Sequence, residues 1–318
     1  MRRLNLLLLA LATVLLVWLL WEIGWASLAR HLRQVGWGWP ILLLPYGVVS
    51  CLETLAWEFL LITKSARSRL VLLFWLRLGG EALNQLTPTA SLGGEPYKVV
   101  RLQAAGLSFD EATASVVIHK ALKVLSLLLY IVLGLLATPL LLPEASAHLT
   151  ALSLAAAALG LGILAFIVVA GQDPCLRILR LLERVEMCPG FLKEKEEELS
   201  RLDARLASFY RSYPGKSLLA FLLLFLAWIC HGVEVYLIFF LLGHPIGWGE
   251  ALCLDALTMI FTSLGFFIPA ALGFQEGGNI LLALGFHLGA PLGAAFSILR
   301  RVREAFWMGL GLMVAAWK

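Results

Sequence analysis

Long apolar runs recur along this 318-residue chain, and they constrain its fold more than any other feature. The first run, Leu4–Trp21, is about long enough to cross a hydrocarbon core of roughly 30 Å as a helix. Hydrophobic residues make up 60% of the chain and charged residues 14%, and the mean hydropathy is +0.87. Soluble domains are about 45–50% apolar and about 25% charged. The sequence therefore predicts a single all-α, multi-pass transmembrane domain over residues 1–318.

Six of the apolar runs are predicted to be full membrane spans, and two more are interrupted by polar residues. The full spans are predicted at Leu4–Trp21, Pro40–Ile62, Glu111–Leu142, Leu152–Ala170, Ser217–Leu242 and Leu292–Trp317. The apolar stretches that begin at Val71 and Glu250 instead run into proline, glycine and polar side chains. We expect these two to be re-entrant helical hairpins, because irregular backbone at membrane depth is tolerated only when protein or a wet cavity surrounds it.

The distribution of basic residues predicts the orientation. Residues 64–69 contain three basic side chains and no acid, and residues 172–216 contain nine basic and eight acidic side chains. Lysine and arginine concentrate in cytoplasmic loops, so both segments and both termini are expected in the cytoplasm of a cell with a bacterial-type inner (plasma) membrane. Mixed charge in 172–216 favours a solvated, salt-bridged helix pair over a docking site for a partner. The first apolar run is too long for a signal peptide and is expected to be retained.

The two interrupted regions match each other at a nearly constant offset. Pro88–Glu95 aligns with Pro269–Glu276, 181 positions later, and Ala114–Lys123 aligns with Ala294–Arg303, 180 positions later. This predicts repeat one at about 71–142 and repeat two at about 250–317. Counting crossings makes the two hairpins enter from opposite sides, an inverted repeat of the kind found in many secondary transporters. The alternative is that the breaks look alike because turns reuse the same few residue types.

Five basic side chains lie on the two helices that follow the breaks: Lys120, Lys123, Arg300, Arg301 and Arg303. Ionisable groups inside a membrane are costly and usually face a polar cavity. Helix N-termini beside such a cavity also attract anions. The sequence therefore predicts a pocket for a phosphate-bearing group, with Lys120 and Arg300 as the leading candidates. The alternatives are structural pairing with acidic residues and snorkelling toward the membrane interface.

Acidic and amide side chains beside the breaks are further candidates for the substrate site. Glu95 and Glu276 follow the breaks directly, where a carboxylate can cap the next helix, form an ion pair or take part in proton coupling. Asn84 and Gln85 precede the first break. They could bind a head group or satisfy the polar groups of the broken backbone.

His231 and Glu234 lie three positions apart, on one face of a predicted helix. They are expected to form a proton relay or a structural pair. A metal site is disfavoured because no third and fourth ligand stand at suitable spacing. The five cysteines are scattered without a recognised pattern, so they predict neither a disulfide framework nor a metal centre. No cofactor is predicted.

These motifs resemble a known family. They are Asn84-x-Leu86-x-Pro88, Gly93-Gly94-Glu95 with Lys98, Ile268-Pro269, Gly273-Phe274-Gln275-Glu276-Gly277 and the basic helix Arg300–Glu304. The chain resembles the flippase-like family named for the transmembrane region of lysylphosphatidylglycerol synthase, and within it short hopanoid-associated inner-membrane proteins. The resemblance implies a lipid translocase with two oppositely oriented re-entrant elements. Two features depart from the family pattern: Ala270 replaces an expected glycine, and no acidic residue stands beside Lys120.

The sequence thus predicts a lipid flippase that moves an amphiphilic, anionic lipid across the inner membrane. It predicts no enzymatic activity, no nucleic-acid partner and a membrane lipid as the substrate. No soluble transferase domain is expected after Lys318, which argues against a lipid-modifying synthase. One alternative is an integral-membrane transferase acting on a lipid carrier, which normally needs a metal-binding acidic pair. The other is a scaffold of lipid biosynthesis, which would gain little from buried charge.

Overall fold

The computed structural model describes residues 30, 33–62, 70–87, 92–141, 154–162, 174–184, 196–265 and 268–316, and every regular element in these ranges is helical. Three of the described helices are long and apolar enough to cross a membrane: Arg33–Phe59, Phe109–Leu141 and Pro214–Leu241. They match three of the predicted full spans. The predicted span Leu4–Trp21 lies outside the described residues, and the span at 152–170 is described only as a helix over 154–162. The sixth predicted span, Leu292–Trp317, corresponds to a helix over Ala290–Ala316 that is not among these three, so the count of six crossings stays a prediction.

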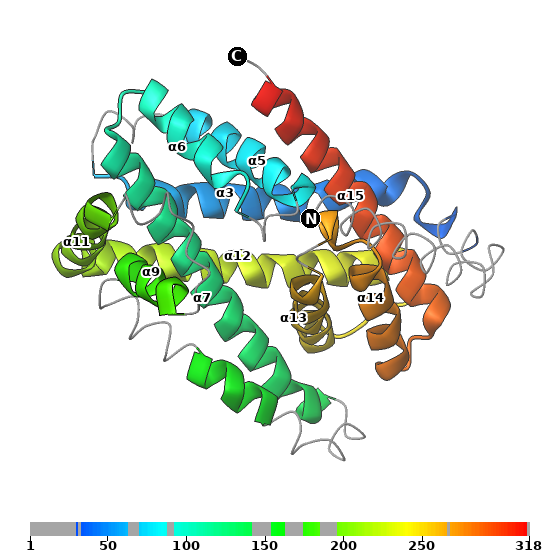
Figure 1. The fold of residues 1–318 in the computed structure, drawn as a ribbon. Coiled ribbons are helices and arrows are strands. Elements are labelled where there is room, and N and C mark those ends of the chain that lie inside the picture. Colours follow the sequence, from blue (N-terminus) through cyan, green and yellow to red (C-terminus); the bar gives the residue numbers. More distant parts are fainter. Residues whose placement is uncertain are drawn as a thin grey trace.

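Two series of four helices make up most of the fold (Figure 1). The first half contains α3 (Leu43–Phe59), α5 (Leu70–Leu86), α6 (Glu95–Ala104) and α7 (Phe109–Leu141). The second half contains α12 (Pro214–Leu241), α13 (Trp248–Leu264), α14 (Phe274–Gly285) and α15 (Ala290–Ala316). Shorter elements are the 3-10 helices η1 (Gly36–Leu42) and η3 (Pro269–Ala271), together with α9 (Pro174–Arg184) and α11 (Glu196–Ser212). In each half a break separates the second helix from a short third helix.

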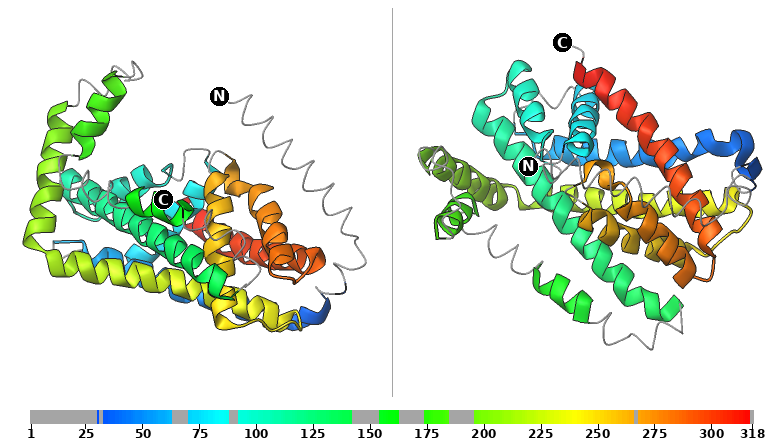
Figure 2. Two further views of the ribbon diagram at one scale, coloured as in Figure 1. Left: turned by 90° about the horizontal axis from the view of Figure 1, so that it is seen from below. Right: turned by 45° about the vertical axis from the view of Figure 1, so that its right-hand side comes forward.

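Six of these helices form a closed ring of pairwise contacts. Around the ring, α7 packs on α6, α6 on α5, α5 on α15, α15 on α14, α14 on α13, and α13 on α7. The helices α3 and α12 lie side by side along one side of this ring (Figure 2). The second helix of each half therefore contacts the last helix of the other half.

Small residues bring the two halves close together at both of these cross-contacts. A Cβ atom added at Gly311 of α15 would lie 2.5 Å from the carbonyl oxygen of Leu78 on α5. A Cβ atom added at Gly134 of α7 would lie 2.4 Å from the Cβ atom of Ala256 on α13. Within a membrane, small residues allow helices to approach closely and gain van der Waals contact. A larger side chain at either glycine would push the halves apart.

The hydrophilic segment 172–216 contains the expected helix pair. The helices α9 and α11 pack against each other, and the Leu176 N–H donates to Asp203 Oδ2 at 2.9 Å. Leu206 and Phe209 are buried where α11 contacts α7 and α12. The pair therefore joins one end of the bundle through an apolar face, and it projects from that end in Figure 2. Its cytoplasmic placement stays a prediction.

Candidate functional site

The first break is held by the side chain of Asn84, at the end of α5. Its Oδ1 accepts the Gly94 N–H at 2.7 Å, and its Nδ2 donates to Glu95 Oε1 at 2.9 Å and to Glu81 Oε2 at 3.1 Å. Gly94 needs to be glycine because a Cβ there would overlap the carbonyl of Gly80. Of the two roles expected for Asn84, the structure shows the contact with the broken backbone. Residues 88–91 lie outside the described part of the chain.

The second break contains two consecutive alanines in the left-handed region. Ala270 has φ 53° and Ala271 has φ 49°, and Gly273 follows at φ 84°. Glu276 Oε2 accepts the Gly273 N–H at 2.7 Å and so caps the start of α14. Arg301 Nη1 donates to the Ala270 carbonyl at 2.8 Å. The basic helix α15 therefore contacts a strained backbone segment directly.

All five basic residues predicted for the substrate site have carboxylate partners. They belong to a set of fourteen charged side chains, here called the charge network, none of which is more than 23% exposed. Its basic members are Arg77, Lys98, Lys120, Lys123, Arg300, Arg301 and Arg303, and its acidic members are Glu53, Glu81, Glu95, Glu234, Asp255, Glu276 and Glu304. Every one of these ion pairs joins two residues of the same half.

In the first half, Lys123 of α7 bridges two acids. Its Nζ lies 3.1 Å from Glu53 of α3 and 2.5 Å from Glu81 of α5. Glu53 also pairs with Arg77 Nη1 at 2.5 Å. Sequence reasoning missed Arg77, although an arginine inside the apolar stretch 70–78 is the kind of signal that marks a buried charge.

A second group in the first half surrounds Glu95, at the start of α6. Lys98 Nζ lies 3.1 Å from Glu95 Oε2, and Lys120 Nζ lies 3.5 Å from Glu95 Oε1. Glu95 is therefore an ion-pair partner for cations on α6 and α7. Lys120 is the most exposed member of the charge network, at 23%.

In the second half, the three arginines of α15 point to three different helices. Arg300 pairs with Asp255 of α13 at 2.6 Å, and Arg303 pairs with Glu234 of α12 at 2.8 Å. Arg301 pairs with Glu276 of α14 at 2.5 Å. Arg301 and Arg303 also approach Glu304, at 2.8 and 4.0 Å, but the shortest ion pair of each arginine is with a different helix. The structure therefore does not bring these three arginines together around one pocket.

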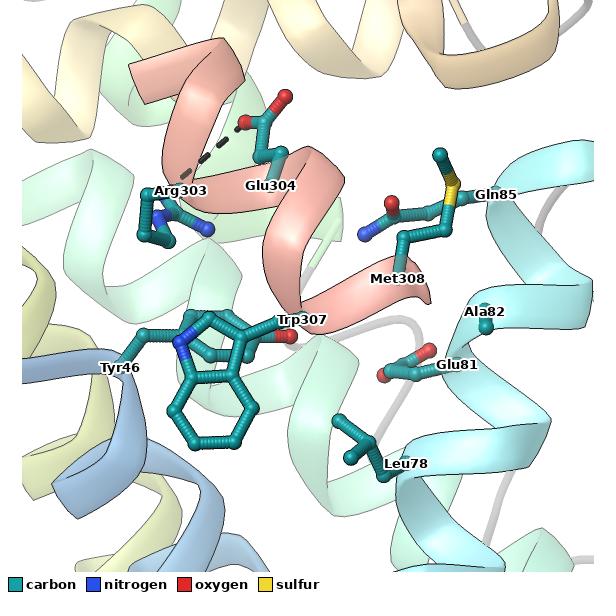
Figure 3. A pocket seen from close by; sticks show the side chains of 9 residues that line it. All are labelled: Tyr46, Leu78, Glu81, Ala82, Gln85, Arg303, Glu304, Trp307 and Met308. Atoms are coloured by element: carbon teal, nitrogen blue, oxygen red, sulfur yellow. Dashed lines mark ion pairs between the residues drawn. The ribbon is translucent and has the colours of Figure 1, made fainter. Parts of the chain in front are cut away.

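A small hollow, with a cavity volume of about 10 Å³, lies between α3, α5 and α15, where the two halves meet (Figure 3). We call it the interhalf pocket. It is lined by Tyr46, Leu78, Glu81, Ala82, Gln85, Arg303, Glu304, Trp307 and Met308. Of the residues predicted for the substrate site, Gln85 and Arg303 line this pocket. Sequence reasoning missed Tyr46 and Trp307, because no local pattern distinguishes them from the other aromatic residues.

The interhalf pocket combines hydrogen-bond donors with carboxylates. The guanidinium carbon of Arg303 lies 4.7 Å from the centre of the Tyr46 ring, and its Nε donates to Glu234. Trp307 Nε1 has no hydrogen-bond partner among the described residues. A buried donor without an acceptor is costly, so this N–H is suited to an acceptor oxygen brought by a ligand or by water.

These features agree with one family of membrane proteins. A family model described as the lysylphosphatidylglycerol synthase TM region matches residues 5–311. The chain belongs to this family. No curated protein and no solved structure gives a significant match. The family resemblance seen in the motifs is confirmed, and association with hopanoids stays a prediction.

Membership of the lysylphosphatidylglycerol synthase TM family, together with the apolar helices, identifies the chain as a membrane protein with a function related to membrane lipids. Ala270, which stands where a glycine is expected, has a left-handed backbone conformation with a φ of 53°. A left-handed conformation costs an alanine roughly 1–2 kcal/mol and a glycine almost nothing.

In this family member, His231 and Glu234 of α12 lie next to Arg303. His231 Nδ1 is 4.0 Å from Glu234 Oε2, and neither atom has a hydrogen-bond partner among the described residues. Glu234 Oε1 accepts from Arg303 Nε at 2.8 Å. Within the described ranges, no group of three histidine, cysteine, aspartate or glutamate side chains is placed to hold a metal ion.

Proposed function

We propose that this protein moves an amphiphilic, phosphate-bearing anionic lipid between the leaflets of a bacterial inner membrane. The observation that carries the proposal is the interhalf pocket, in which ionisable and hydrogen-bonding side chains line a hollow inside an apolar bundle. Such groups are expensive within a membrane and usually mark a substrate pathway. Binding sites between two structural repeats are typical of secondary transporters.

The pocket lining suits the head group of such a lipid. Arg303 supplies a cation, and Trp307 Nε1 and the Gln85 amide supply neutral donors for phosphate oxygens. The rest of the lining combines the apolar side chains of Leu78, Ala82 and Met308 with two carboxylates. Glu81 is paired with Lys123, and Glu304 is paired with Arg301. The pocket's cavity volume of about 10 Å³ is room for about one water molecule, so the head group would enter only when the two halves separate here, while the acyl chains stay in the bilayer.

The arrangement of ion pairs supports a rocking motion of the two halves. Each pair in the charge network joins residues of one half, so the halves can move relative to each other without separating any of these charges. Alternating access in inverted-repeat transporters is largely a rigid-body motion of this kind.

Two further observations support the proposed inverted repeat. The reciprocal packing of α5 on α15 and of α13 on α7 is what two interlocked repeats would produce. Glu53 and Glu234 lie 181 positions apart, Lys123 and Arg303 lie 180 apart, and each acid pairs with the base of its own half. The repeats would then begin at α3 and α12, earlier than the 71 and 250 expected from the breaks.

Leaflet exchange in reconstituted vesicles tests the proposed function. Fluorescent anionic, zwitterionic and polyprenyl-phosphate lipids are followed by their accessibility to a membrane-impermeant reductant. We expect exchange of an anionic class, slowed about 3- to 10-fold in Trp307→Phe, the equivalent of one hydrogen bond. Trp75→Phe is the matched control, because Trp75 lies on the outer face of α5, where it is 37% exposed.

Absence of leaflet exchange would contradict the proposal. If folded protein exchanges none of these lipids, the translocation proposal is wrong. Mass spectrometry of the same vesicles then tests the alternative suggested by the family name, an integral-membrane transferase. A chemically altered lipid would establish that alternative.

A further inference from the structure

The ion pairs at equivalent positions of the two halves differ in one respect. In the first half, both oxygens of Glu53 face cations, because Arg77 and Lys123 approach it together. In the second half, Glu234 pairs with Arg303 through Oε1, while Oε2 has no hydrogen-bond partner among the described residues. His231 Nδ1 lies 4.0 Å from that oxygen. A titratable imidazole thus takes the place of a permanent cation.

From this difference we infer that His231 and Glu234 form a proton-binding site coupled to the binding of an anionic head group at Arg303. The inference rests on the proposed function, because it assigns the driving ion to the same pocket. A proton on His231 gives Glu234 a second cationic partner. Arg303, which lines the interhalf pocket, is then able to exchange Glu234 for a phosphate group of the lipid.

Charge balance inside the bundle gives the physical reason for coupling. The charge network contains as many basic as acidic side chains when all are ionised, so a bound anion would add one uncompensated charge. The second half alone contains four carboxylates and three arginines. Uncompensated charge in a low-dielectric interior is strongly unfavourable. One proton taken up with each anion removes the imbalance.

His231 is buried and faces more cations than carboxylates, which disfavours its protonated form until an anion binds nearby. The charged groups that face it are Arg303 and Arg300 of α15, Asp255 of α13, Lys123 of α7 and Arg77 of α5. Tyr46 of α3 contacts both the imidazole ring and the Arg303 guanidinium. Asp255 is already paired with Arg300 at 2.6 Å. Among these groups, only histidine ordinarily changes its charge between pH 5 and 8.

Proton uptake on lipid binding tests the inference directly. Purified full-length protein in weakly buffered detergent is titrated with short-chain phosphatidylglycerol, whose phosphodiester keeps one negative charge, and released or absorbed protons are read with an indicator dye. We expect uptake of about one proton per lipid bound above the histidine transition, and an affinity that falls about tenfold per pH unit there. Short-chain phosphatidylcholine, which has no net charge, should cause no uptake.

His231→Gln should abolish both the proton uptake and the pH dependence of binding. Glu234→Gln should do the same, which guards against a single variant that folds poorly. His119→Gln is the matched control, because His119 is also buried, and its ring hydrogen-bonds to the backbone oxygen of Glu53 and packs on the ring of Trp57. It should retain proton uptake.

The outcomes separate this inference from the proposed function. Binding and leaflet exchange without proton uptake, or uptake that persists in folded His231→Gln protein, would overturn the coupling and leave translocation intact. If no lipid binds and none is exchanged, the translocation proposal fails and the coupling fails with it.

Discussion

Each of the seven cations in the charge network lies within 3.5 Å of a carboxylate oxygen. At the scale of single residues, this pairing explains how an apolar bundle tolerates so much charge. It also means that each basic residue already has a carboxylate partner with which an anionic ligand would compete. Arg300, a leading candidate from the sequence, is 2% exposed and pairs with Asp255 outside the pocket lining. Arg303 is equally buried but lines the pocket, so it is the better placed of the two.

A structural role for Arg300 can be tested by removing one or both partners. Arg300→Met alone should cost about 3–5 kcal/mol, because it leaves a buried carboxylate without its cation, whereas Arg300→Met with Asp255→Asn should recover most of that loss. The free energy of unfolding in mixed micelles measures both. Arg205→Met is the control: Arg205 is 51% exposed and pairs with Asp110, so its loss should cost less than about 1 kcal/mol. Full stability in Arg300→Met combined with loss of lipid exchange would make Arg300 a head-group ligand instead.

At each of the two breaks a side chain accepts a hydrogen bond from a backbone N–H, but the accepting group differs. In the first, Asn84 accepts the Gly94 N–H, and in the second, the Glu276 carboxylate accepts the Gly273 N–H. Buried backbone donors need such partners wherever a helix is interrupted. The second break also carries left-handed alanines, held by the bond from Arg301 to the Ala270 carbonyl.

Relief of this backbone strain gives a prediction at the scale of the element. Ala270→Gly should raise the free energy of unfolding by about 1 kcal/mol, because glycine adopts a φ of 53° without the steric cost that alanine bears. Thermal unfolding in detergent measures the change. Ala204→Gly, at an exposed position in the interior of α11, should instead lower stability by about 0.5–1 kcal/mol. Equal effects at the two positions would mean that Ala270 is not strained.

At the scale of the whole molecule, the sequence predicts where helices form better than it predicts which helices contact each other. Apolar length, turn residues and the near-constant offset are local signals, so they correctly indicated helices on both sides of each break. The pocket could not be predicted, because Tyr46 and Trp307 lie 261 positions apart and meet only through the packing of α3, α5 and α15. The same holds for the partner of Arg300, since a buried arginine looks alike in sequence whether it meets Asp255 or a phosphate.

The proposed inverted repeat makes a last prediction, about which side of the membrane each half faces. The C-terminal ends of α6 and α14 lie at opposite ends of the bundle (Figures 1 and 2). In a variant without native cysteines, Gln103→Cys and Gly285→Cys place single thiols at these exposed ends. We expect an impermeant maleimide to label Gln103→Cys from the cytoplasmic side and Gly285→Cys from the opposite side.

A thiol at exposed Ser212 of α11 provides the internal reference, because segment 172–216 is expected in the cytoplasm. Gln103→Cys should share its labelling pattern in right-side-out and inverted vesicles, and Gly285→Cys should show the reverse pattern. If both test positions label from one side, the two halves run in the same direction, and alternating access by exchange of inverted repeats is excluded. The interhalf pocket would then open toward a single face, which suits a transferase that binds its lipid from one leaflet better than a translocase.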